Sequence, residues 1–338
     1  MSYKVNIKSI IPNKILLLFR TLRDLTTLIP NAIYDSYRYL TYSGMNRSRA
    51  YKGAHEARIT MAYHQIEKGL SLSQPRPGFG VQAIERLIRE LKTYIDQYGL
   101  VEPATNSIAT IRSYIEFNES AGLDMTKLRN TLQNLVKVNN NQGNECANGG
   151  VKYVTSKQMA RERLSTFDNL ITSRHSVRDY TGLPIDDSEI EKAIELSRNT
   201  PSVCNRQAWK VHAYTDQKKI TELLEIQSGG GGFGEKSSVL LVITCDLERF
   251  INVDERYQAW IDGGMFSMSL CLSLHYQGYG TCCLNWSKQR KDDKKLRKAT
   301  GIKPNEQVIM MMAVGTIPDE FKVAYSPRVS TDKILTIY

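Results

Sequence analysis

The sequence predicts an α+β protein whose N-terminal region is mostly helical. Apolar residues recur at helical spacing from Val81 to Tyr98, where they would cover one face of a helix. Continuous apolar runs at 239–244 and 307–315 are bounded by turn residues and instead indicate buried strands. Further helices are expected at 107–119, 126–138, 217–226 and 257–277. Strands therefore enter in the second part of the chain, where they alternate with helices.

Length and composition favour two globular regions. The chain has 338 residues, of which 41% are hydrophobic, and this length is typical of about two domains. Residues 138–150 read VNNNQGNECANGG, with many turn formers and few apolar residues, so we expect a linker there. We predict a helical N-terminal extension at 1–150 and a second domain at 151–338.

The formal charge of +10 is concentrated near the N-terminus. No nucleic-acid module accompanies this basic region, so nucleic acid is not an expected partner. Apolar residues at helical spacing occur between Ile10 and Ile29, but Lys14, Arg20 and Arg23 interrupt the run, which excludes a membrane span. The resulting amphipathic helix either makes peripheral contact with a membrane or packs on the protein body or a second copy.

The cysteines show no metal-binding spacing. They contain no CxxC pair and have no histidine partners at metal-ligand spacing, so no metal site is expected. Without a secretory signal they are predicted to be reduced thiols of a cytoplasmic protein. For Cys204 a small buried side chain is favoured over a reactive thiol. The six positions are Cys146, Cys204, Cys245, Cys271, Cys282 and Cys283.

Two polar clusters flank one predicted helix. Arg174, His175, Ser176 and Arg178 form the first, which follows a helix expected at about 157–172. Two guanidinium groups and a hydroxyl suit a phosphate or an electron-rich ring edge. The next helix is expected to be capped by Asp187 or Ser188 and to stop at Pro201. The second cluster, 201–209, reads PSVCNRQAW and leads into a strand expected at 210–214.

Together the clusters resemble the FMN-dependent nitroreductase family. Arg174, Ser176 and Arg178 fit an RxSxR-like opening. Pro201, Ser202, Asn205, Gln207 and Trp209 fit a P-S-x-x-N-x-Q-x-W segment. The resemblance runs from about residue 167 onward and implies a mixed sheet flanked by helices. It also implies a homodimer, with FMN held noncovalently at the subunit interface.

The resemblance further assigns roles to particular residues. Arg174, His175, Ser176 and Arg328 would hold the flavin phosphate, and Arg178 would face the pyrimidine edge. Pro201, Ser202 and Asn205 would approach the ring from the partner subunit, and Gln207 is a further expected cofactor-binding residue. The backbone near Leu284 and Asn285 would lie at flavin N5, where a fixed donor tunes the cofactor. No protein nucleophile or catalytic acid is required, and the role of Trp286 stays open between substrate wall and core.

Two further segments qualify this assignment. Residues 64–70 read HQIEKGL and resemble a segment of longer nitroreductase-like proteins linked to polysaccharide gene clusters. They either reach the flavin or substrate, or form an interdomain contact. Residues 229–234, GGGGFG, match GxGxxG but lie between a helix and a strand, the wrong order for a dinucleotide fold.

The resemblance implies an oxidoreductase that uses NAD(P)H and FMN to reduce a small organic acceptor in two hydride-transfer steps. The alternative is a non-catalytic or flavin-binding partner in cell-envelope polysaccharide biosynthesis. A third reading keeps the flavin chemistry but changes the acceptor to an enone or a biosynthetic intermediate.

Overall fold

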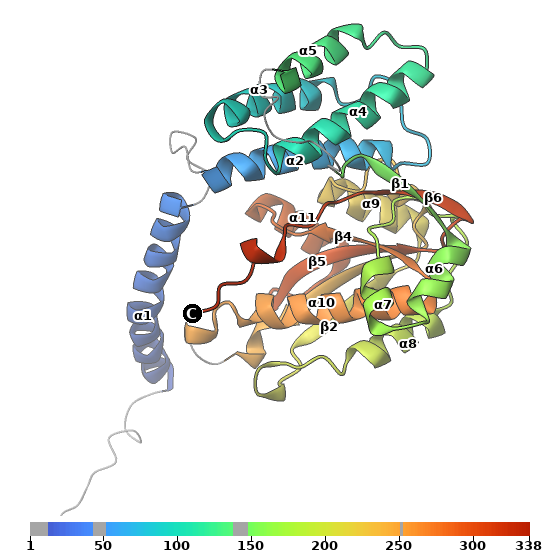
Figure 1. Ribbon diagram of the computed structural model, residues 1–338. Coiled ribbons are helices and arrows are strands. Elements are labelled where there is room, and N and C mark those ends of the chain that lie inside the picture. Colours follow the sequence, from blue (N-terminus) through green and yellow to red (C-terminus); the bar gives the residue numbers. More distant parts are fainter. Residues whose placement is uncertain (1–12, 43–51, 138–147, 251–252) are drawn as a thin grey trace, which may run out of the picture.

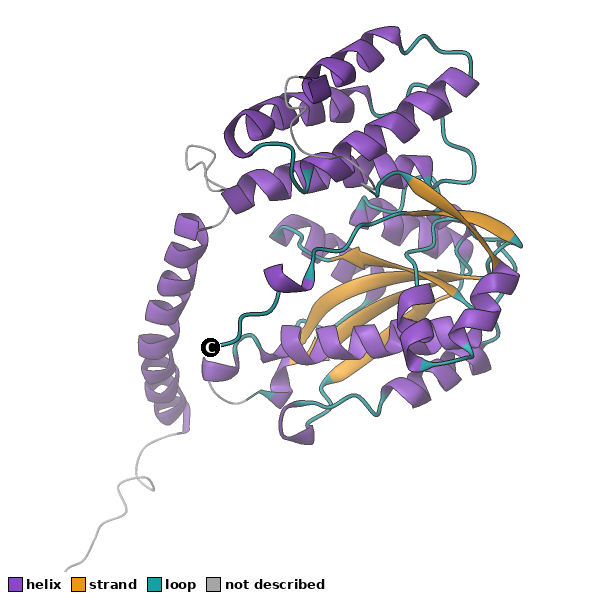
Figure 2. Ribbon diagram, in the orientation of Figure 1, coloured by secondary structure: helices purple, strands orange, loops and turns teal. Residues whose placement is uncertain are grey.

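The computed structural model describes residues 13–42, 52–137, 148–250 and 253–338. Helices and strands are both present, as the sequence predicts (Figures 1 and 2). The helices are α1 (Asn13–Tyr42), α2 (Lys52–Leu70), α3 (Val81–Tyr98), α4 (Ala104–Ser120), α5 (Thr126–Lys137), α6 (Ser156–Arg163), α7 (Phe167–Ser173), α8 (Asp187–Ser197), α9 (Gln217–Gln227), α10 (Gln258–Gln277) and α11 (Arg290–Thr300). The strands are β1 (Val151–Thr155), β2 (Trp209–Tyr214), β3 (Val239–Asp246), β4 (Gly280–Asn285), β5 (Glu306–Gly315) and β6 (Glu320–Ala324).

Helices α2 to α5 pack around a core of their own. Ile66 of α2, Leu87 and Leu91 of α3 and Ile111 of α4 are fully buried in it. The apolar spacing of α3 places its buried residues on one face, which is why this helix was predictable. Figure 1 shows α2 between the other helices of this group and the strands, and α2 also contacts β6.

A four-stranded sheet forms the centre of the second region. Its order is β2-β3-β5-β4 and its strand pairs are antiparallel, while an isolated parallel bridge joins Ser176 to Thr281 of β4. Helices α8 and α10 cover one face, and α9 and α11 cover the other. Strand β3 is buried along its whole length, which explains its continuous apolar sequence.

A two-stranded ribbon connects the helical region to the C-terminal segment. Strand β1 pairs antiparallel with β6, so that Lys152 lies opposite Val323. The backbone N–H of Tyr325 donates to the carbonyl of Gly150 at 3.0 Å and extends this pairing. The ribbon therefore places the residues after β6 beside the start of the second region.

Several sequence expectations need correction. The single helix expected at 157–172 is two helices, because the Thr166 hydroxyl accepts from Asn169 N at 3.2 Å and caps α7. The N-cap of α8 is Asp186, not Asp187 or Ser188. Strands β1, β4 and β6 were not predicted. Most of the expected linker, 138–147, and the start of the amphipathic segment at 10–12 lie outside the described residues.

Helix α1 covers the rest of that amphipathic segment. Many of its large apolar side chains are exposed, including Leu17, Phe19 and Ile33. Among the described helices, none combines the length and the apolar content that crossing a membrane requires.

Candidate functional site

The first cluster lies on an extended segment fixed at the edge of the sheet. Helix α7 ends at Ser173, and Arg174 follows in an extended conformation. The Val177 N–H donates to the Thr281 carbonyl of β4 at 2.9 Å. Tyr180, which is buried, donates its hydroxyl proton to the carbonyls of Val177 at 2.9 Å and Ala313 at 3.3 Å. These contacts fix the segment at Val177, near its C-terminal end, while α7 precedes it directly.

Arg174, His175 and Ser176 line a cavity of about 660 Å³ together with Arg328. The opposite wall comes from Lys152 of β1 and from the segment after β6. The β1–β6 ribbon brings these two walls together although they are far apart in sequence. The sequence analysis expected Arg328 to lie close to the first cluster, and both line this one cavity.

The lining of this cavity is strongly cationic. It includes Lys152, Arg174 and Arg328, and no carboxylate is among its lining residues in the described part of the chain. Burial, followed by the charges of Lys152 and Arg174, lowers the pKa of His175 to about 3. His175 is therefore a neutral imidazole at neutral pH and offers one ring N–H as a donor. A cavity of this size and charge suits a phosphorylated ligand.

Arg178 adjoins this cavity but is not among the residues that line it. It is buried, with 6% of its surface exposed, and its Nη1 donates to the carbonyl of Ser176 at 3.4 Å. Its Nε has no hydrogen-bond partner among the described residues. Leaving a buried guanidinium donor unsatisfied is costly, so this atom indicates a position where a ligand acceptor would be stabilised.

The open edge of β4 adds backbone donors near Arg178. The Thr281 carbonyl points to this edge, since it accepts from Val177. Peptide groups two residues apart in a strand point the same way, so the backbone groups of Cys283 and Asn285 also face it. Those of Leu284 point toward β5, and its side chain is in the core. Strand geometry therefore favours Cys283 over Leu284 as the residue whose backbone N–H could donate to a ligand at this edge.

The second cluster lies at the other end of α10 from the first. The Val203 N–H donates to the Asp262 carboxylate at 3.2 Å, in the first half of α10. The first cluster instead adjoins the second half, where Ser173 Oγ lies 2.9 Å from His275 Nε2. These helix positions are about 20 Å apart along the axis. Pro201, Ser202, Asn205 and Gln207 are therefore not brought to the cationic cavity within one chain.

Side-chain contacts give the second cluster a fixed shape. Ser202 Oγ accepts from the Gln207 N–H at 3.0 Å, and Arg206 forms an ion pair with Glu255. Cys204, Asn205 and Gln207 have positive φ angles of 48°, 52° and 50°. The expectation of a buried Cys204 was wrong, because this tight turn points its side chain outward and leaves it exposed.

The glycine run and Trp286 have structural roles. Residues 229–234 lie between α9 and β3, as expected, and a Cβ added to Gly234 would lie 2.3 Å from Leu224 Cδ1. This close approach requires glycine. Trp286 is 5% exposed, belongs to the core beside α11, and its Nε1 donates to Asp293 at 3.3 Å. Its position favours the core interpretation over a substrate wall.

The model of the nitroreductase family matches residues 171–231 and 229–316. Because of this match, residues 171–316 are called the nitroreductase domain. The matched part contains both clusters, the glycine run and β4, whereas α2 to α5 lie outside it.

Two curated relatives resemble the nitroreductase domain. One, from Archaeoglobus fulgidus, is named as an NADH dehydrogenase or NAD(P)H nitroreductase and is 27% identical over 157 residues, 45% of this chain and 85% of the relative. The other is named an NADPH-dependent oxidoreductase of Staphylococcus aureus and is 22% identical over 181 residues, 49% of this chain and 70% of the relative.

Solved structures also resemble the nitroreductase domain. An FMN-dependent nitroreductase from Clostridium difficile has a TM-score of 0.43 and 22% identity, covering 50% of this chain and 96% of its own. A protein from Exiguobacterium sibiricum, described as a nitroreductase in complex with FMN, has a TM-score of 0.45 and 17% identity, covering 52% of this chain and 98% of its own.

Sequence reasoning missed Lys152, which lies just before the nitroreductase domain. It is on β1, and its Nζ lies 5.8 Å from the centre of the Tyr325 ring. A short strand beside a polar linker has only a weak sequence pattern. The alternation of Val151, Tyr153 and Thr155 with Lys152 was nevertheless a usable strand signal.

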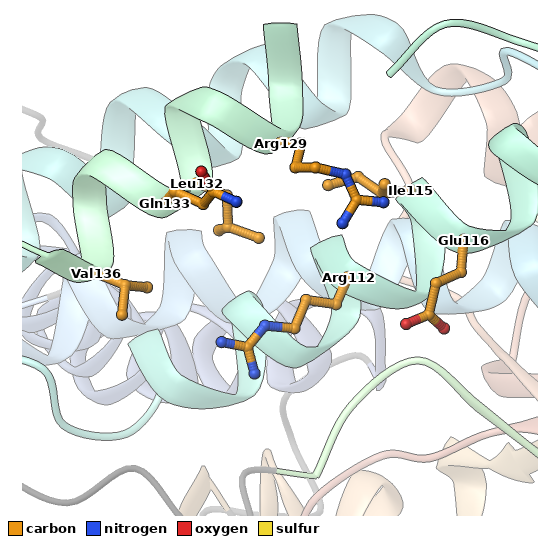
Figure 3. A pocket seen from close by; sticks show the side chains of 7 residues that line it. All are labelled: Arg112, Ile115, Glu116, Arg129, Leu132, Gln133 and Val136. Atoms are coloured by element: carbon orange, nitrogen blue, oxygen red, sulfur yellow. The ribbon is translucent and has the colours of Figure 1, made fainter. Parts of the chain in front are cut away.

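A second cavity, of about 440 Å³, lies outside the nitroreductase domain between α4 and α5 (Figure 3). Arg112, Ile115 and Glu116 line it from α4. Leu132 and Val136 line it from α5. None of the residues predicted to bind a cofactor lines this cavity.

Proposed function

We propose that this protein binds FMN and uses NAD(P)H to reduce a small organic acceptor. The observation that carries the proposal is the cationic cavity lined by Arg174, Ser176 and Arg328, within and beside a nitroreductase-family domain. The names of the two curated relatives, which include NAD(P)H and NADPH, support the same electron donor.

In this proposal the cavity takes the FMN phosphate. Arg174, Arg328 and Lys152 supply positive charge, and the Ser176 hydroxyl adds a short donor. Each charge-assisted hydrogen bond contributes about 1.5 to 3 kcal/mol. His175 contributes an uncharged donor, because its lowered pKa keeps it neutral.

The flavin ring would lie along the open edge of β4. Arg178 Nε, which lacks a partner among the described residues, would meet the pyrimidine edge. The backbone N–H of Cys283 is the donor that strand geometry directs to the same edge, with Asn285 next along it. Donors fixed by a strand need no reorganisation during reaction.

When bound, FMN supplies the hydride-transfer chemistry between NAD(P)H and the acceptor. The protein's contribution is to bind, orient and polarise, and no residue is assigned as a nucleophile or catalytic acid. The nature of the acceptor stays open between nitroaromatic compounds, enones and biosynthetic intermediates.

We further propose a homodimer in which α10 forms the interface. Trp260, Ile261, Met265, Met268 and Tyr276 expose apolar surface along this helix. Met268 also lines the cationic cavity. Pairing two copies along α10 would cover this surface and allow Pro201, Ser202, Asn205 and Gln207 of one copy to reach the flavin of the other.

The direct test is the cofactor content of the purified protein. We expect a yellow protein whose flavin spectrum is bleached by NADH or NADPH under anaerobic conditions. Arg174→Ala should lose most of its FMN, whereas Arg161→Ala, an exposed change on α6, should retain it. A wild-type protein that neither carries FMN nor binds it on addition would rule the proposal out.

The second candidate is a flavin-binding partner without catalytic activity in cell-envelope polysaccharide biosynthesis. The glycine run at 229–234, which offers few side chains beside the ring, favours it. The same spectra separate the two functions, because bound FMN that neither NADH nor NADPH reduces would support the non-catalytic role.

Peripheral membrane contact is a separate proposal and rests on the exposed apolar side chains of α1. Deleting residues 1–30 should abolish sedimentation with anionic liposomes if this helix binds them. Unchanged sedimentation of the shortened protein would exclude α1 as the contact.

A further inference from the structure

Helix α2 has one side in the helical core and another side that leaves it. The buried apolar residues of the first side include Ile59, Tyr63, Ile66 and Leu70. On the second side, Thr60 and Met61 are exposed, whereas Glu67 and Ser71 near the end of the helix are buried. His64 lies between these two groups, and its side chain is 39% exposed. It therefore lies at the border between solvent and the covered end of α2.

The covered end of α2 adjoins the nitroreductase domain. Figure 1 shows α2 between the other helices of its group and the strands, and the helix contacts β6. Leu72, just after α2, packs on the core that includes Cys282 and Leu284 of β4. A Cβ added to Gly232 would lie 3.2 Å from Leu72 Cδ1. The last turns of α2 are therefore held beside β4, along whose open edge the flavin ring would lie.

His64 and Glu67 form a hydrogen-bonded pair in these last turns. His64 Nδ1 lies 3.2 Å from Glu67 Oε2. A carboxylate only accepts hydrogen bonds, so Nδ1 carries the hydrogen of this contact. The other ring nitrogen, Nε2, has no hydrogen-bond partner among the described residues. Because the ring is partly exposed, Nε2 can exchange a proton with water.

The Glu67 carboxylate is fully buried, and only one of its two oxygens is satisfied. Oε2 contacts His64, but Oε1 has no hydrogen-bond partner in the described part of the chain. A buried acceptor without a partner is costly, so this atom indicates a position that an N–H or O–H of a bound molecule would stabilise. The pair thus offers a ligand one acceptor, Oε1, and one proton-bearing nitrogen, Nε2.

A second pair on the same helix shows what a purely structural contact looks like. His55 Nε2 lies 3.0 Å from Glu90 Oε2 of α3, and the His55 side chain is only 8% exposed. Arg58 Nε also contacts this carboxylate oxygen, at 3.3 Å. The His55–Glu90 pair therefore joins two helices within the helical region, and its carboxylate has a permanent cationic partner.

We propose that the His64–Glu67 pair belongs to the acceptor site and that His64 Nε2 gives a proton to the molecule being reduced. Glu67 is a positioning residue in this inference, because Oε2 orients the imidazole while Oε1 accepts a hydrogen bond from the acceptor. The inference rests on the proposed FMN-dependent reduction and adds to it a proton donor from outside the family match. It also assigns a role to the HQIEKGL segment.

The chemistry of the acceptor requires such a proton. Reduction of a nitro group to a nitroso group takes up one hydride and one proton, while one N–O bond breaks and the oxygen leaves as water. An enone takes a hydride at one carbon and a proton at its neighbour. The hydride comes ultimately from NAD(P)H, and the proton would come from His64 Nε2. Water would then return a proton to the exposed ring.

The test compares two acceptors that differ in their need for a proton. The FMN-bound protein is reduced anaerobically with NADPH or NADH and mixed with nitrofurazone, a nitro compound with N–H groups, or with ferricyanide, which takes electrons only. His64→Gln should slow reoxidation of the flavin by nitrofurazone about 100-fold, the usual contribution of a general acid. Its reoxidation by ferricyanide and its reduction by NAD(P)H should stay unchanged.

Two further variants complete this comparison. Glu67→Gln removes the charge that orients His64 and should lower the nitrofurazone rate about tenfold, again without affecting ferricyanide. His55→Gln removes the structural histidine of the same helix and should leave the ratio of the two rates unchanged. Thermal unfolding of each variant shows whether it is folded, and His64→Asn replaces His64→Gln if the latter is not.

A second measurement uses the oxidised protein and involves no turnover. Diethyl pyrocarbonate should label His64, and nitrofurazone should slow this labelling, which mass spectrometry of the peptides detects. Labelling that nitrofurazone does not affect would overturn the inference, even if no variant of His64 folds.

The rates separate the inference from the proposed function. An unchanged nitrofurazone rate in a folded His64 variant, or an equal loss with both acceptors, would overturn the inference and leave FMN binding intact. A wild type that ferricyanide reoxidises but nitrofurazone does not would have the same meaning. Failure of the wild type to bind FMN would instead overturn both.

Discussion

At the scale of single residues, the cationic cavity depends on positively charged side chains that come from distant parts of the sequence. Lys152 comes from β1 and Arg328 from the segment after β6. Both are close to His175, whose pKa they help to lower. Placing these positive charges close together costs free energy when no ligand is bound, and a bound anion offsets that cost. This behaviour is expected of a site that binds anions.

Changes at Lys152 and Arg328 should therefore affect phosphate recognition selectively. We expect Lys152→Met and Arg328→Met each to weaken FMN binding about 10- to 100-fold, from the loss of one charge-assisted interaction. Riboflavin lacks the phosphate, so its Kd should change little in either variant. Fluorescence titration measures both ligands, and equal losses for FMN and riboflavin would argue against a phosphate site here.

Buried His275 and partly buried His175 should make stability depend on pH. Burial lowers the pKa of His175 to about 3 and that of His275 to about 4, against about 6.5 in an unfolded chain. The two neutral side chains therefore make their full contribution to the free energy of unfolding above pH ~6.5. This contribution declines as pH falls from about 6.5 toward 4, because the unfolded chain then binds more protons than the folded one.

Replacing His275 by Gln should flatten this dependence. Urea unfolding between pH 4.5 and 8 would give the free energy of unfolding for both proteins. We expect a smaller slope below pH ~6.5 in the variant and parallel curves above pH ~7, because both histidines are neutral there. Identical slopes below pH ~6.5 would mean that His275 does not titrate as its burial indicates.

At the scale of elements, α10 carries two neighbouring glycines with different surroundings. A Cβ at Gly263 would lie 2.6 Å from Ile309 Cγ1 and 3.0 Å from Cys245 Sγ, whereas a Cβ at Gly264 meets nothing within 4 Å. Gly263 therefore permits the close approach of α10 to the sheet, and Gly264 does not face it.

This difference gives a matched pair of substitutions. Gly263→Ala should lower the free energy of unfolding by about 1 to 3 kcal/mol through overpacking. Gly264→Ala should leave it unchanged or raise it by up to about 1 kcal/mol, because alanine is the better helix former. Chemical denaturation measures both, and equal effects at the two positions would contradict the packing described here.

The sequence predicted elements with strong periodicity well and short elements poorly. Helix α3 has the bounds that its apolar spacing predicts, Val81 to Tyr98. Strands β1 and β6 have five residues each, which is too short for a comparable periodic signal. The break between α6 and α7 depends on the Thr166 cap, a local contact that periodicity cannot reveal.

The same contrast applies to the site. The RxSxR-like and P-S-x-x-N-x-Q-x-W segments were recognisable because their residue types and order are specific. The meeting of Lys152 with Arg174 and Arg328 depends on the packing of distant segments, which no local pattern reveals. Which β4 amide faces the open edge also required the observed strand pairing.

At the scale of the whole molecule, the exposed apolar side of α10 predicts dimerisation. Trp260 and Met265 are 42% and 39% exposed, and a charge there should oppose pairing of two copies. Trp260→Glu combined with Met265→Glu should give a monomer with weakened FMN binding, measured by light scattering and titration. Val81→Glu, at a 55% exposed position on α3 in the helical region, is the control.

A monomeric double variant that binds FMN as the wild type does would contradict the assignment of the second cluster to the partner's flavin. A wild-type monomer would contradict the dimer itself, while leaving the cationic cavity as a binding site within one chain.

The β1–β6 pairing also affects when the cationic cavity can form during synthesis. Strand β1 leaves the ribosome with Lys152 long before its partner strand, and Arg328 follows only after β6. Until translation has passed residue 328, the nascent chain lacks Arg328 and so one of the three cations of the cavity. Cofactor loading is therefore expected only after that residue has been synthesised and β6 has paired with β1.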